Sequence, residues 1–187
     1  MIDAAVARRI RLVGLDVDGV LTDGGLYIGQ AGDHPVELKR FHIQDGLGIK
    51  LLQMAGLAVA FVTARASDAT RARARELKVD DVILDNRKLP AFADLIARRG
   101  FEWDECCFVG DDLPDLPLLR RVGLPIAVAN AVPEVLAAAA HVTAAAGGDG
   151  AVREVAHALL TARGTWDSTV AQYLHQREEA RVPARSG

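Results

Sequence analysis

The chain has 187 residues, of which 50% are hydrophobic and 25% charged, and its formal net charge at pH 7 is −3. These values predict one globular domain with its own core, and they exclude the overall basic charge typical of a nucleic-acid-binding protein. No apolar run approaches the roughly 20 residues of a membrane-spanning helix, and the first residues lack the features of a secretory signal, so we expect a cytoplasmic protein with no membrane partner.

The first 41 residues predict a buried strand followed by a hairpin. Residues 11–17 are almost continuously apolar, which is typical of a strand covered on both faces in a parallel sheet. In residues 24–41, apolar residues alternate with others on either side of Gly32 and Asp33, which have the composition of a turn. We therefore expect a β-hairpin directly after the first strand.

Strands and helices alternate over most of the remaining chain. We expect further strands at residues 57–64, 81–84, 105–110, 125–129 and 141–144. We expect helices at residues 45–56, 67–78, 88–100, 113–123, 131–140 and 150–164, with Ser67 as an N-cap and Gly100 as a C-terminal stop. This alternation predicts an α/β fold, namely a doubly wound, mostly parallel, Rossmann-like sheet with helices on both faces and right-handed crossovers.

Two further features complete the domain organisation. From Thr165 onward the chain is polar and charged, so we divide it into a domain at 1–164 and a C-terminal tail at 165–187. The tail is either a short helix with a frayed end or an arm that docks on a partner.

Cys106 and Cys107 are adjacent within an apolar run, which indicates small core residues and not a disulfide or metal site.

Polar residues follow four of the predicted strands, where ligands bind in an open parallel sheet. In chain order they are Asp16 and Asp18, then Thr63 and Arg65, then Lys88, and finally Asp111, Asp112 and Asp115. Clustered carboxylates repel one another unless a cation relieves them, and hard oxygen ligands suit Mg²⁺. A lysine and a hydroxyl at the same edge would hold a phosphate group. The pattern therefore predicts a Mg²⁺-assisted phosphoryl-transfer site.

The spacing of the first two aspartates fits a two-step hydrolysis. Asp16 would attack phosphorus to form an aspartyl-phosphate, and Asp18 would protonate the leaving alkoxide and then deprotonate water. The alternative is that both are ordinary turn residues. A single "DxD" favours that alternative, whereas its combination with Thr63, Lys88 and "GDDLPD" favours the catalytic interpretation.

These residues carry a resemblance. Over about residues 11–160, "DVDGVLTDG", "VTAR", Lys88 and "GDDLPD" are similar, in order, to the four motifs of the haloacid dehalogenase-like phosphatases. The resemblance implies that Asp16 is the nucleophile and a metal ligand. It also implies that Asp18 is the general acid/base and meets Mg²⁺ through its backbone carbonyl.

The same resemblance assigns the other motif residues. Thr63 and Lys88 would hold the transferring phosphoryl group, and Asp111 would be a further metal ligand. Asp112 and Asp115 would act on the metal through its other ligands or through water.

A narrower resemblance is carried by "LTDGGLYIG", "FHIQDGLGIKLL", "VGDDLPDLPLLRRVGLPIAVANA" and "GGDGAVREV". These stretches resemble the 3-deoxy-D-manno-octulosonate 8-phosphate (KDO 8-phosphate) phosphatases. The resemblance implies a role in lipopolysaccharide biosynthesis, no separate cap domain, and a homotetramer in which the hairpin contributes to assembly and a neighbouring subunit helps close the site. The candidate substrate-binding residues are Arg65, Thr22, Asp23, Gly24, Gln44, Asp45 and Gly46.

The sequence departs from this family pattern at three positions. Ala64 stands where many members have glycine, Gln44 where some have arginine, and Asp149 where several have a basic residue. The retained Arg65 would bind the carboxylate of a sugar acid. The alternative substrates are a nine-carbon keto-acid 9-phosphate or another small phosphate ester.

The motif residues also bear on two non-enzymatic alternatives. A phospho-accepting receiver module also combines acids, a hydroxyl and a lysine, but its acceptor aspartate follows the third strand, where this chain has "DNRK". An inactive assembly factor would have lost Asp16 or Lys88, and both are present. Asn130 would either order the acidic loops or cap a helix.

Overall fold

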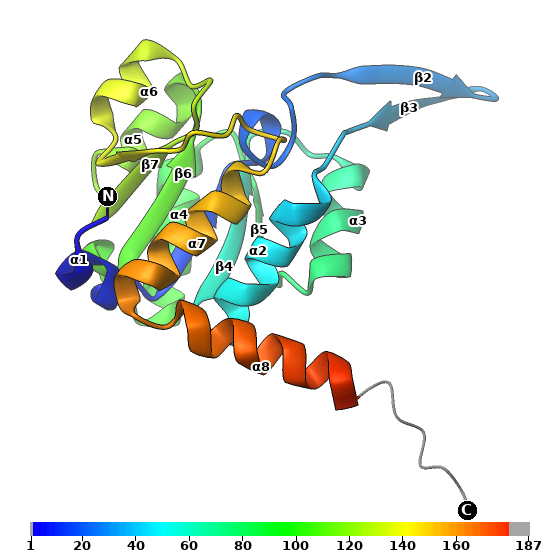
Figure 1. The fold of residues 1–187 in the computed structure, drawn as a ribbon. Coiled ribbons are helices and arrows are strands. Elements are labelled where there is room, and N and C mark those ends of the chain that lie inside the picture. The colour runs from blue at the N-terminus through cyan, green and yellow to red at the C-terminus, as the bar shows by residue number, and fades with distance from the viewer. Residues whose placement is uncertain (1, 180–187) are drawn as a thin grey trace, which may run out of the picture.

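A six-stranded parallel sheet forms the centre of the protein (Figure 1). The structure is a computed structural model that describes residues 2–179. The strand order is β5-β4-β1-β6-β7-β8. The strands are β1 (Leu12–Leu15), β4 (Ala58–Thr63), β5 (Asp81–Leu84), β6 (Cys106–Gly110), β7 (Leu124–Ala127) and β8 (His141–Val142).

The strand order places a topological switch point at the centre of the sheet. From β1 the chain builds outward through β4 to β5, and then returns to add β6 on the other side of β1. Leu12 is therefore paired with both Ala58 and Cys106. Every residue of β1 and β6 is buried, which explains why both sequences are continuously apolar. Crevices that bind ligands open at such switch points, beyond the carboxyl ends of the strands.

Helices cover both faces of the sheet. They are α1 (Ala4–Arg9), α2 (Ile43–Met54), α3 (Asp68–Leu77), α4 (Lys88–Arg99), α5 (Leu116–Leu119), α6 (Pro133–Ala138), α7 (Ala151–Arg163) and α8 (Trp166–Glu179). In Figure 1, α2 and α7 lie in front of the sheet and α4 lies behind it. The predicted caps are confirmed, because the Ser67 side chain accepts from Thr70 N and Gly100 ends α4 with φ 64°. The predicted doubly wound α/β fold is confirmed.

The predicted hairpin is present and projects away from the body of the protein (Figure 1). Strands β2 (Tyr27–Ala31) and β3 (His34–Leu38) form a two-stranded antiparallel sheet around the predicted Gly32–Asp33 turn. Several large apolar side chains on it and next to it are exposed, among them Leu26, Tyr27, Ile28, Leu38 and Ile43.

The helix predicted at 113–123 is much shorter in the structure. Leu113–Asp115 form a single 3-10 turn, and α5 covers only the next four residues, Leu116–Leu119. The prediction was too long because Gly123 must bring the chain against the backbone of Asp104, where a Cβ would clash. The chain therefore leaves the helix after Leu119 and turns into β7.

Cys106 and Cys107 are free and buried in the core. Burial, with a smaller contribution from the nearby Glu105, raises the pKa of the Cys106 thiol to about 12. Burial likewise raises the pKa of the Cys107 thiol. Both thiols are therefore protonated at neutral pH, and the prediction of small core residues is confirmed.

The segment after residue 164 begins with α8. Trp166 and Tyr173 of this helix pack against the hydrophobic core, and α8 contacts α2 and α7. The expected frayed end or docking arm beyond residue 179 lies outside the described residues. Within residues 2–179, none of the helices combines the length and the apolar character that crossing a bilayer requires.

Candidate active site

The predicted catalytic and metal-binding residues meet in one cavity. It has a volume of about 210 Å³ and lies beyond the carboxyl ends of β1, β4 and β6. Its lining residues are Asp16, Asp18, Thr63, Ala64, Arg65, Lys88, Asp111, Asp112, Pro114 and Asp115. Residues from four separate stretches of the chain converge because parallel strands end at the same edge of a sheet.

Lys88 joins two buried carboxylates that line the cavity. Its Nζ lies 2.8 Å from Asp16 Oδ1 and 2.7 Å from Asp115 Oδ1. The exposed fractions are 5% for Asp16, 5% for Lys88 and 0% for Asp115. Burial by itself favours the neutral amine, but the charges of Asp16 and Asp115 outweigh it and raise the pKa of Lys88. Lys88 is therefore a fixed positive charge at neutral pH.

The carboxylates around Lys88 carry more negative charge than it neutralises. Burial, followed by repulsion from Asp115, raises the pKa of Asp16 well above its usual value despite the presence of Lys88. Burial and the charge of Asp115 also raise the pKa of Asp111 to about 6. Such a cluster favours binding of a cation, which would relieve the repulsion.

The oxygen atoms of this cluster fit a small divalent cation. One carboxylate oxygen from each of Asp16, Asp111 and Asp115 lies within 4.8 Å of the others. Asp111 Oδ1 is buried, and no hydrogen-bond donor within the described residues reaches it. Asp115 uses Oδ1 for Lys88 and Oδ2 for the backbone N–H groups of Asp111 and Asp112. Asp16, in contrast, contacts Lys88 through Oδ1 alone among the described residues, so the oxygens most available to a cation are Asp16 Oδ2 and those of Asp111. Hard oxygen donors of this kind suit Mg²⁺.

Glycines allow the acidic loops to approach one another. Gly19 has φ 99°, and a Cβ at this position would overlap the Asp111 carboxylate. At Gly110, a Cβ would lie 2.6 Å from Asp115. Asp115 Oδ2 in turn accepts from the backbone N–H of Asp111 at 3.0 Å, which fixes the loop after β6. The exposed Asp112 caps the turn at Leu113–Asp115.

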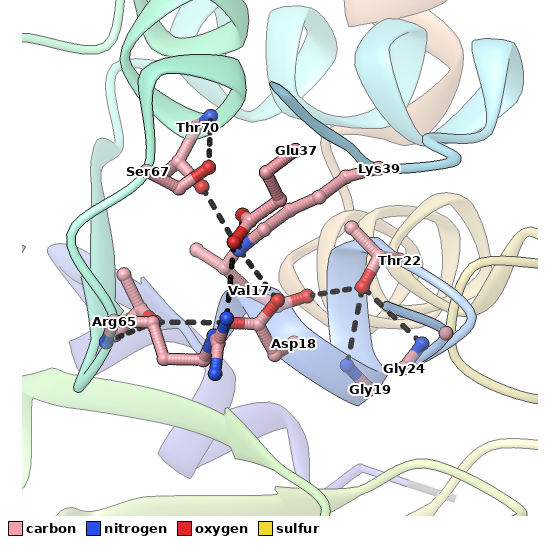
Figure 2. Close-up of polar contacts among 12 residues, drawn as sticks. Val17, Asp18, Gly19, Thr22, Gly24, Glu37, Lys39, Arg65, Ser67 and Thr70 are labelled. Atoms are coloured by element: carbon pink, nitrogen blue, oxygen red, sulfur yellow. Dashed lines mark hydrogen bonds and ion pairs between the residues drawn. The ribbon is translucent and has the colours of Figure 1, made fainter. Parts of the chain in front are cut away.

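The Asp18 carboxylate contacts Lys39 at the base of the hairpin (Figure 2). Its Oδ1 lies 2.6 Å from Lys39 Nζ, and its Oδ2 accepts a hydrogen bond from Thr63 Oγ1 at 3.2 Å. The Asp18 side chain is therefore absent from the group of oxygens that fits a cation. Only its backbone carbonyl is left for the metal contact predicted for this residue.

Lys39 was missed by the sequence analysis, as was its neighbour Glu37. Lys39 follows β3 at the base of the hairpin, and its side chain is only 1% exposed. The signal was present in the sequence, since Glu37 and Lys39 are two residues apart and extended backbone places such residues on one face. On an exposed hairpin, however, charged residues are also common simply because they face water, so the pattern did not distinguish a buried lysine from a surface one.

Arg65 lies at the mouth of the cavity, where it forms an ion pair with Glu37. The distance from Arg65 Nη2 to Glu37 Oε2 is 3.0 Å, and about half of the Arg65 side chain remains exposed. A hydrogen bond from Ser67, together with Arg65, holds the pKa of the Glu37 carboxyl below its usual range. A second anion would therefore compete with Glu37 for the Arg65 guanidinium.

The other candidate substrate-binding residues do not line the cavity within the described chain. Thr22 is fully buried, and its Oγ1 accepts from the backbone N–H groups of Gly19 and Gly24. Asp23 lies on the same loop, where it accepts from Gly25 N and Tyr27 Oη. These contacts hold the loop after β1 in shape.

Three candidates on α2 are likewise outside the cavity. Gln44 is exposed, whereas Asp45 is buried and its Oδ1 accepts from Arg153 N at 2.8 Å in the first turn of α7. At Gly46, a Cβ would lie 2.6 Å from Nη2 of Arg73, the far end of a flexible side chain, and 3.1 Å from Leu77 Cδ2, so Gly46 faces α3. In the described chain, Asp45 and Gly46 therefore join α2 to its neighbouring helices.

The loop that contains Gly147 and Gly148 covers the loop after β1. Gly148 N donates to Val20 O at 2.9 Å, and Asn130 Oδ1 accepts from Gly147 N at 2.8 Å. Since α6 begins only at Pro133, with Val132 as its N-cap, Asn130 orders these loops and does not cap the helix.

Comparisons with known proteins agree with this geometry. A family model described as haloacid dehalogenase-like hydrolase matches residues 84–155. The 3-deoxy-D-manno-octulosonate 8-phosphate phosphatase KdsC of Escherichia coli (strain K12) is 41% identical over 169 residues, which are 90% of this chain and 88% of that protein. KdsC of Yersinia pestis is 40% identical over 158 residues, covering 84% of this chain and 83% of that protein.

Solved structures of proteins named as octulosonate 8-phosphate phosphatases have the same fold as this chain. The phosphatase from Moraxella catarrhalis, in complex with a magnesium ion, a phosphate ion and KDO, is 36% identical with a TM-score of 0.86, and the match covers 91% of this chain and 97% of that chain. The cobalt-bound phosphatase from Haemophilus influenzae is 38% identical with a TM-score of 0.79, covering 85% and 92%. This chain therefore belongs to the haloacid dehalogenase-like hydrolases, within the family of the KDO 8-phosphate phosphatases.

Proposed function

We propose that the protein is a Mg²⁺-dependent phosphomonoesterase that hydrolyses KDO 8-phosphate to KDO and inorganic phosphate. The observation that carries this proposal is the buried Asp16–Lys88–Asp115 cluster, which lies beside Asp111 at the carboxyl edge of the parallel sheet. The family relationship supports the substrate, since relatives named as KDO 8-phosphate phosphatases match nearly the whole chain.

The first chemical step is transfer of the phosphoryl group to Asp16. A carboxylate oxygen of Asp16 forms a bond to phosphorus while the bond from phosphorus to the sugar oxygen breaks. The departing alkoxide takes a proton from the carboxyl group of Asp18. Lys88 and Thr63 bind the phosphoryl oxygens, and the fixed charge of Lys88 stabilises the negative charge that develops on them.

The second step releases phosphate and restores the enzyme. Water attacks the phosphorus of the aspartyl-phosphate, its proton passes to the Asp18 carboxylate, and the bond from phosphorus to Asp16 breaks. Asp16 is then a free carboxylate, and Asp18 carries the proton that the next cycle requires. Each step therefore leaves Asp18 in the protonation state that the following step needs.

The residues that would hold Mg²⁺ are Asp16 and Asp111 through their carboxylates and Asp18 through its backbone carbonyl. When bound, the ion supplies positive charge that offsets the repulsion between the carboxylates and the substrate phosphate. Asp115 holds these ligands in place without binding the ion itself, because it contacts Lys88 and the backbone N–H of Asp111. Asp112 caps the turn that contains Asp115.

Recognition of the sugar acid requires residues beyond the cavity itself. Arg65 is the candidate for the substrate carboxylate, since its guanidinium lies at the cavity mouth and is half exposed. We infer that Thr22, Asp23, Gly24, Gln44, Asp45 and Gly46 contribute by shaping the loops around the entrance. Arg65 on the lining of this 210 Å³ cavity is half exposed, which supports closure of the entrance by a neighbouring subunit.

We further propose a homotetramer in the cytoplasm. The hairpin projects from the body of the chain, and Ile28 on it is 73% exposed, which supports contact with another subunit at this surface. The two free cysteines agree with a reducing compartment. Light scattering of Ile28→Asp beside the unmodified protein tests the assembly, and the proposal requires a smaller particle for the variant.

The activity is tested by phosphate release with Mg²⁺ from a panel of esters, with Asp16→Asn as the blank. The panel contains KDO 8-phosphate, nine-carbon keto-acid 9-phosphates and hexose phosphates. A clear preference for KDO 8-phosphate supports the proposal. Preference for another ester would retain the phosphatase and make Gln44 and Asp149, both exposed, the first positions to exchange. Absence of turnover with every ester, together with a stable phospho-aspartate, would favour a receiver-type module.

A further inference from the structure

Lys39 is a buried cation that has no role in the chemistry described so far. Its side chain is 1% exposed although it comes from the base of a hairpin whose strands are largely exposed. Lysine is rarely buried without a partner, because removing its charge from water is unfavourable. The position of Lys39 therefore requires an explanation in terms of the groups around it.

The group at the shortest distance from Lys39 is the Asp18 carboxylate. Lys39 Nζ lies 2.6 Å from Asp18 Oδ1, in the range of a strong charge-assisted hydrogen bond. The other Asp18 oxygen accepts from the neutral hydroxyl of Thr63 at 3.2 Å. Each oxygen keeps a further lone pair for a proton. In the proposed function the single O–H of Thr63 donates to a phosphoryl oxygen, so Lys39 is the partner that remains to hold the carboxylate when substrate is bound.

The Asp18 side chain needs a partner because neither its backbone nor its surroundings restrict its rotamer. It lies at the start of the segment Val17–Leu21, in which Asp18 and Gly19 have non-helical dihedral angles. Its side chain is 29% exposed on the open side of the cavity, in contrast to the buried Asp16. Without a partner, a carboxylate in this position would be free to change rotamer.

Lys39 is itself held by contacts from two elements (Figure 2). Its Nζ lies 3.4 Å from Thr70 Oγ1 on α3 and 3.6 Å from Glu37 Oε1 on β3. Glu37 in turn is held by Arg65. The hairpin, α3 and the loop after β4 therefore fix the ammonium group from several directions.

We propose that Lys39 is a positioning residue that orients the Asp18 carboxyl toward the leaving oxygen of the phosphate ester. The proposal rests on the role of Asp18 as general acid/base in the proposed function. It adds a residue from outside the four motifs to the catalytic geometry, and it makes the base of the hairpin part of the active site.

The test compares two substrates that differ in their need for a proton. The sugar phosphate that the protein hydrolyses best has an alkoxide leaving group and requires the acid, whereas p-nitrophenyl phosphate releases a stable phenolate. The parameter kcat/KM reports the steps up to departure of the leaving group. The variants are Lys39→Met, Lys39→Arg and Asp18→Asn, and the matched control is Lys50→Met, at an exposed position of α2.

We expect Lys39→Met to lower kcat/KM for the sugar phosphate by about 10- to 100-fold, the range for misplaced catalytic groups. For p-nitrophenyl phosphate the loss is expected to stay below about 3-fold, because the reaction does not depend on proton transfer to the leaving group. Lys39→Arg should recover much of the loss, and Lys50→Met should change neither value. The double variant Asp18→Asn/Lys39→Met should be no slower than Asp18→Asn.

Equal losses on both substrates, or no loss on either, would overturn the proposal and leave Lys39 with a structural role or none. If Lys39→Met does not fold, Lys39→Gln enters the same comparison. The Asp18→Asn arm separates this proposal from the proposed function. If Asp18→Asn itself shows no preference between the substrates, the acid/base assignment of Asp18 is wrong, whatever the result for Lys39.

Discussion

Lys88 and Asp16 form a buried ion pair with an Nζ–Oδ1 distance of 2.8 Å, although 72 residues separate them in the chain. The pair joins the first residue of α4 to the residue directly after β1. It places a fixed positive charge beside the proposed nucleophile. The consequences for activity and for stability can be tested separately.

Asp16→Asn is expected to abolish turnover, because a carboxamide oxygen is a poor nucleophile toward phosphorus. The measurement is phosphate release from the sugar phosphate that the unmodified protein hydrolyses best. Asp94→Asn, an exposed change of the same chemistry on α4, should retain full activity. An Asp16→Asn variant with unchanged activity would exclude the aspartyl-phosphate mechanism.

Lys88→Met is expected to destabilise the protein by about 3–5 kcal/mol at pH 7, because it leaves Asp16 and Asp115 buried without their counter-charge. Urea unfolding measures the loss. At pH 5 the loss should be smaller, since protonated carboxyl groups no longer need a cation. A further exchange, Asp115→Asn in the Lys88→Met background, should recover part of the stability. A loss that does not change with pH would argue that packing, not charge, is the main contribution of Lys88.

Asp111→Asn is expected to stabilise the metal-free protein at pH 7. Burial and Asp115 raise the pKa of Asp111 to about 6 from its ordinary value of 3.8. Between these values the folded state binds more protons than the unfolded state, so the free energy of unfolding falls as pH rises. Removing the charge should therefore raise stability at pH 7 by on the order of 1–3 kcal/mol, and the difference should shrink toward pH 4.

The same variant tests the metal site. Mg²⁺ should raise the unfolding midpoint of the unmodified protein, because it binds only the folded state. It should have little effect on Asp111→Asn, which has lost one of the proposed ligands. Unfolding in EDTA and in Mg²⁺ gives both comparisons. If Asp111→Asn still responds fully to Mg²⁺, Asp111 is not a ligand. If the variant is less stable than the unmodified protein in EDTA, the predicted charge repulsion at Asp111 is wrong.

Gly147→Ala is expected to reduce turnover by about 10- to 100-fold, the range for displaced catalytic groups. A Cβ at Gly147 would overlap the backbone carbonyl of Gly19, and backbone atoms cannot rotate away as a flexible side chain can. The loop between Asp18 and Thr22 must then shift. Asn130→Ala, which removes only the acceptor for Gly147 N, should have a smaller effect in the same assay. An unchanged kcat for Gly147→Ala would contradict this prediction and show that the loop containing Gly147 moves, while the loop that carries Asp18 keeps its position.

The sequence alone was sufficient to predict which residues meet at the carboxyl edge of the sheet. Asp16, Thr63, Lys88 and Asp111 were all predicted to lie at strand ends, and they line one cavity. This prediction succeeded because parallel strands point the same way, so a residue that follows a strand is placed by the topology of the sheet. The apolar runs that form the strands are read directly from the chain.

The tertiary structure alone decided how the loops and the hairpin act on that centre. Asp45 follows the hairpin and was predicted to bind substrate, yet its carboxylate lies at the first turn of α7 in the described chain. Lys39 has an ordinary position in an exposed hairpin sequence, yet its ammonium group contacts Asp18. These contacts depend on how segments far apart in the chain dock against one another. Whether a charged side chain faces solvent or a buried partner is set by that docking and not by the local sequence pattern.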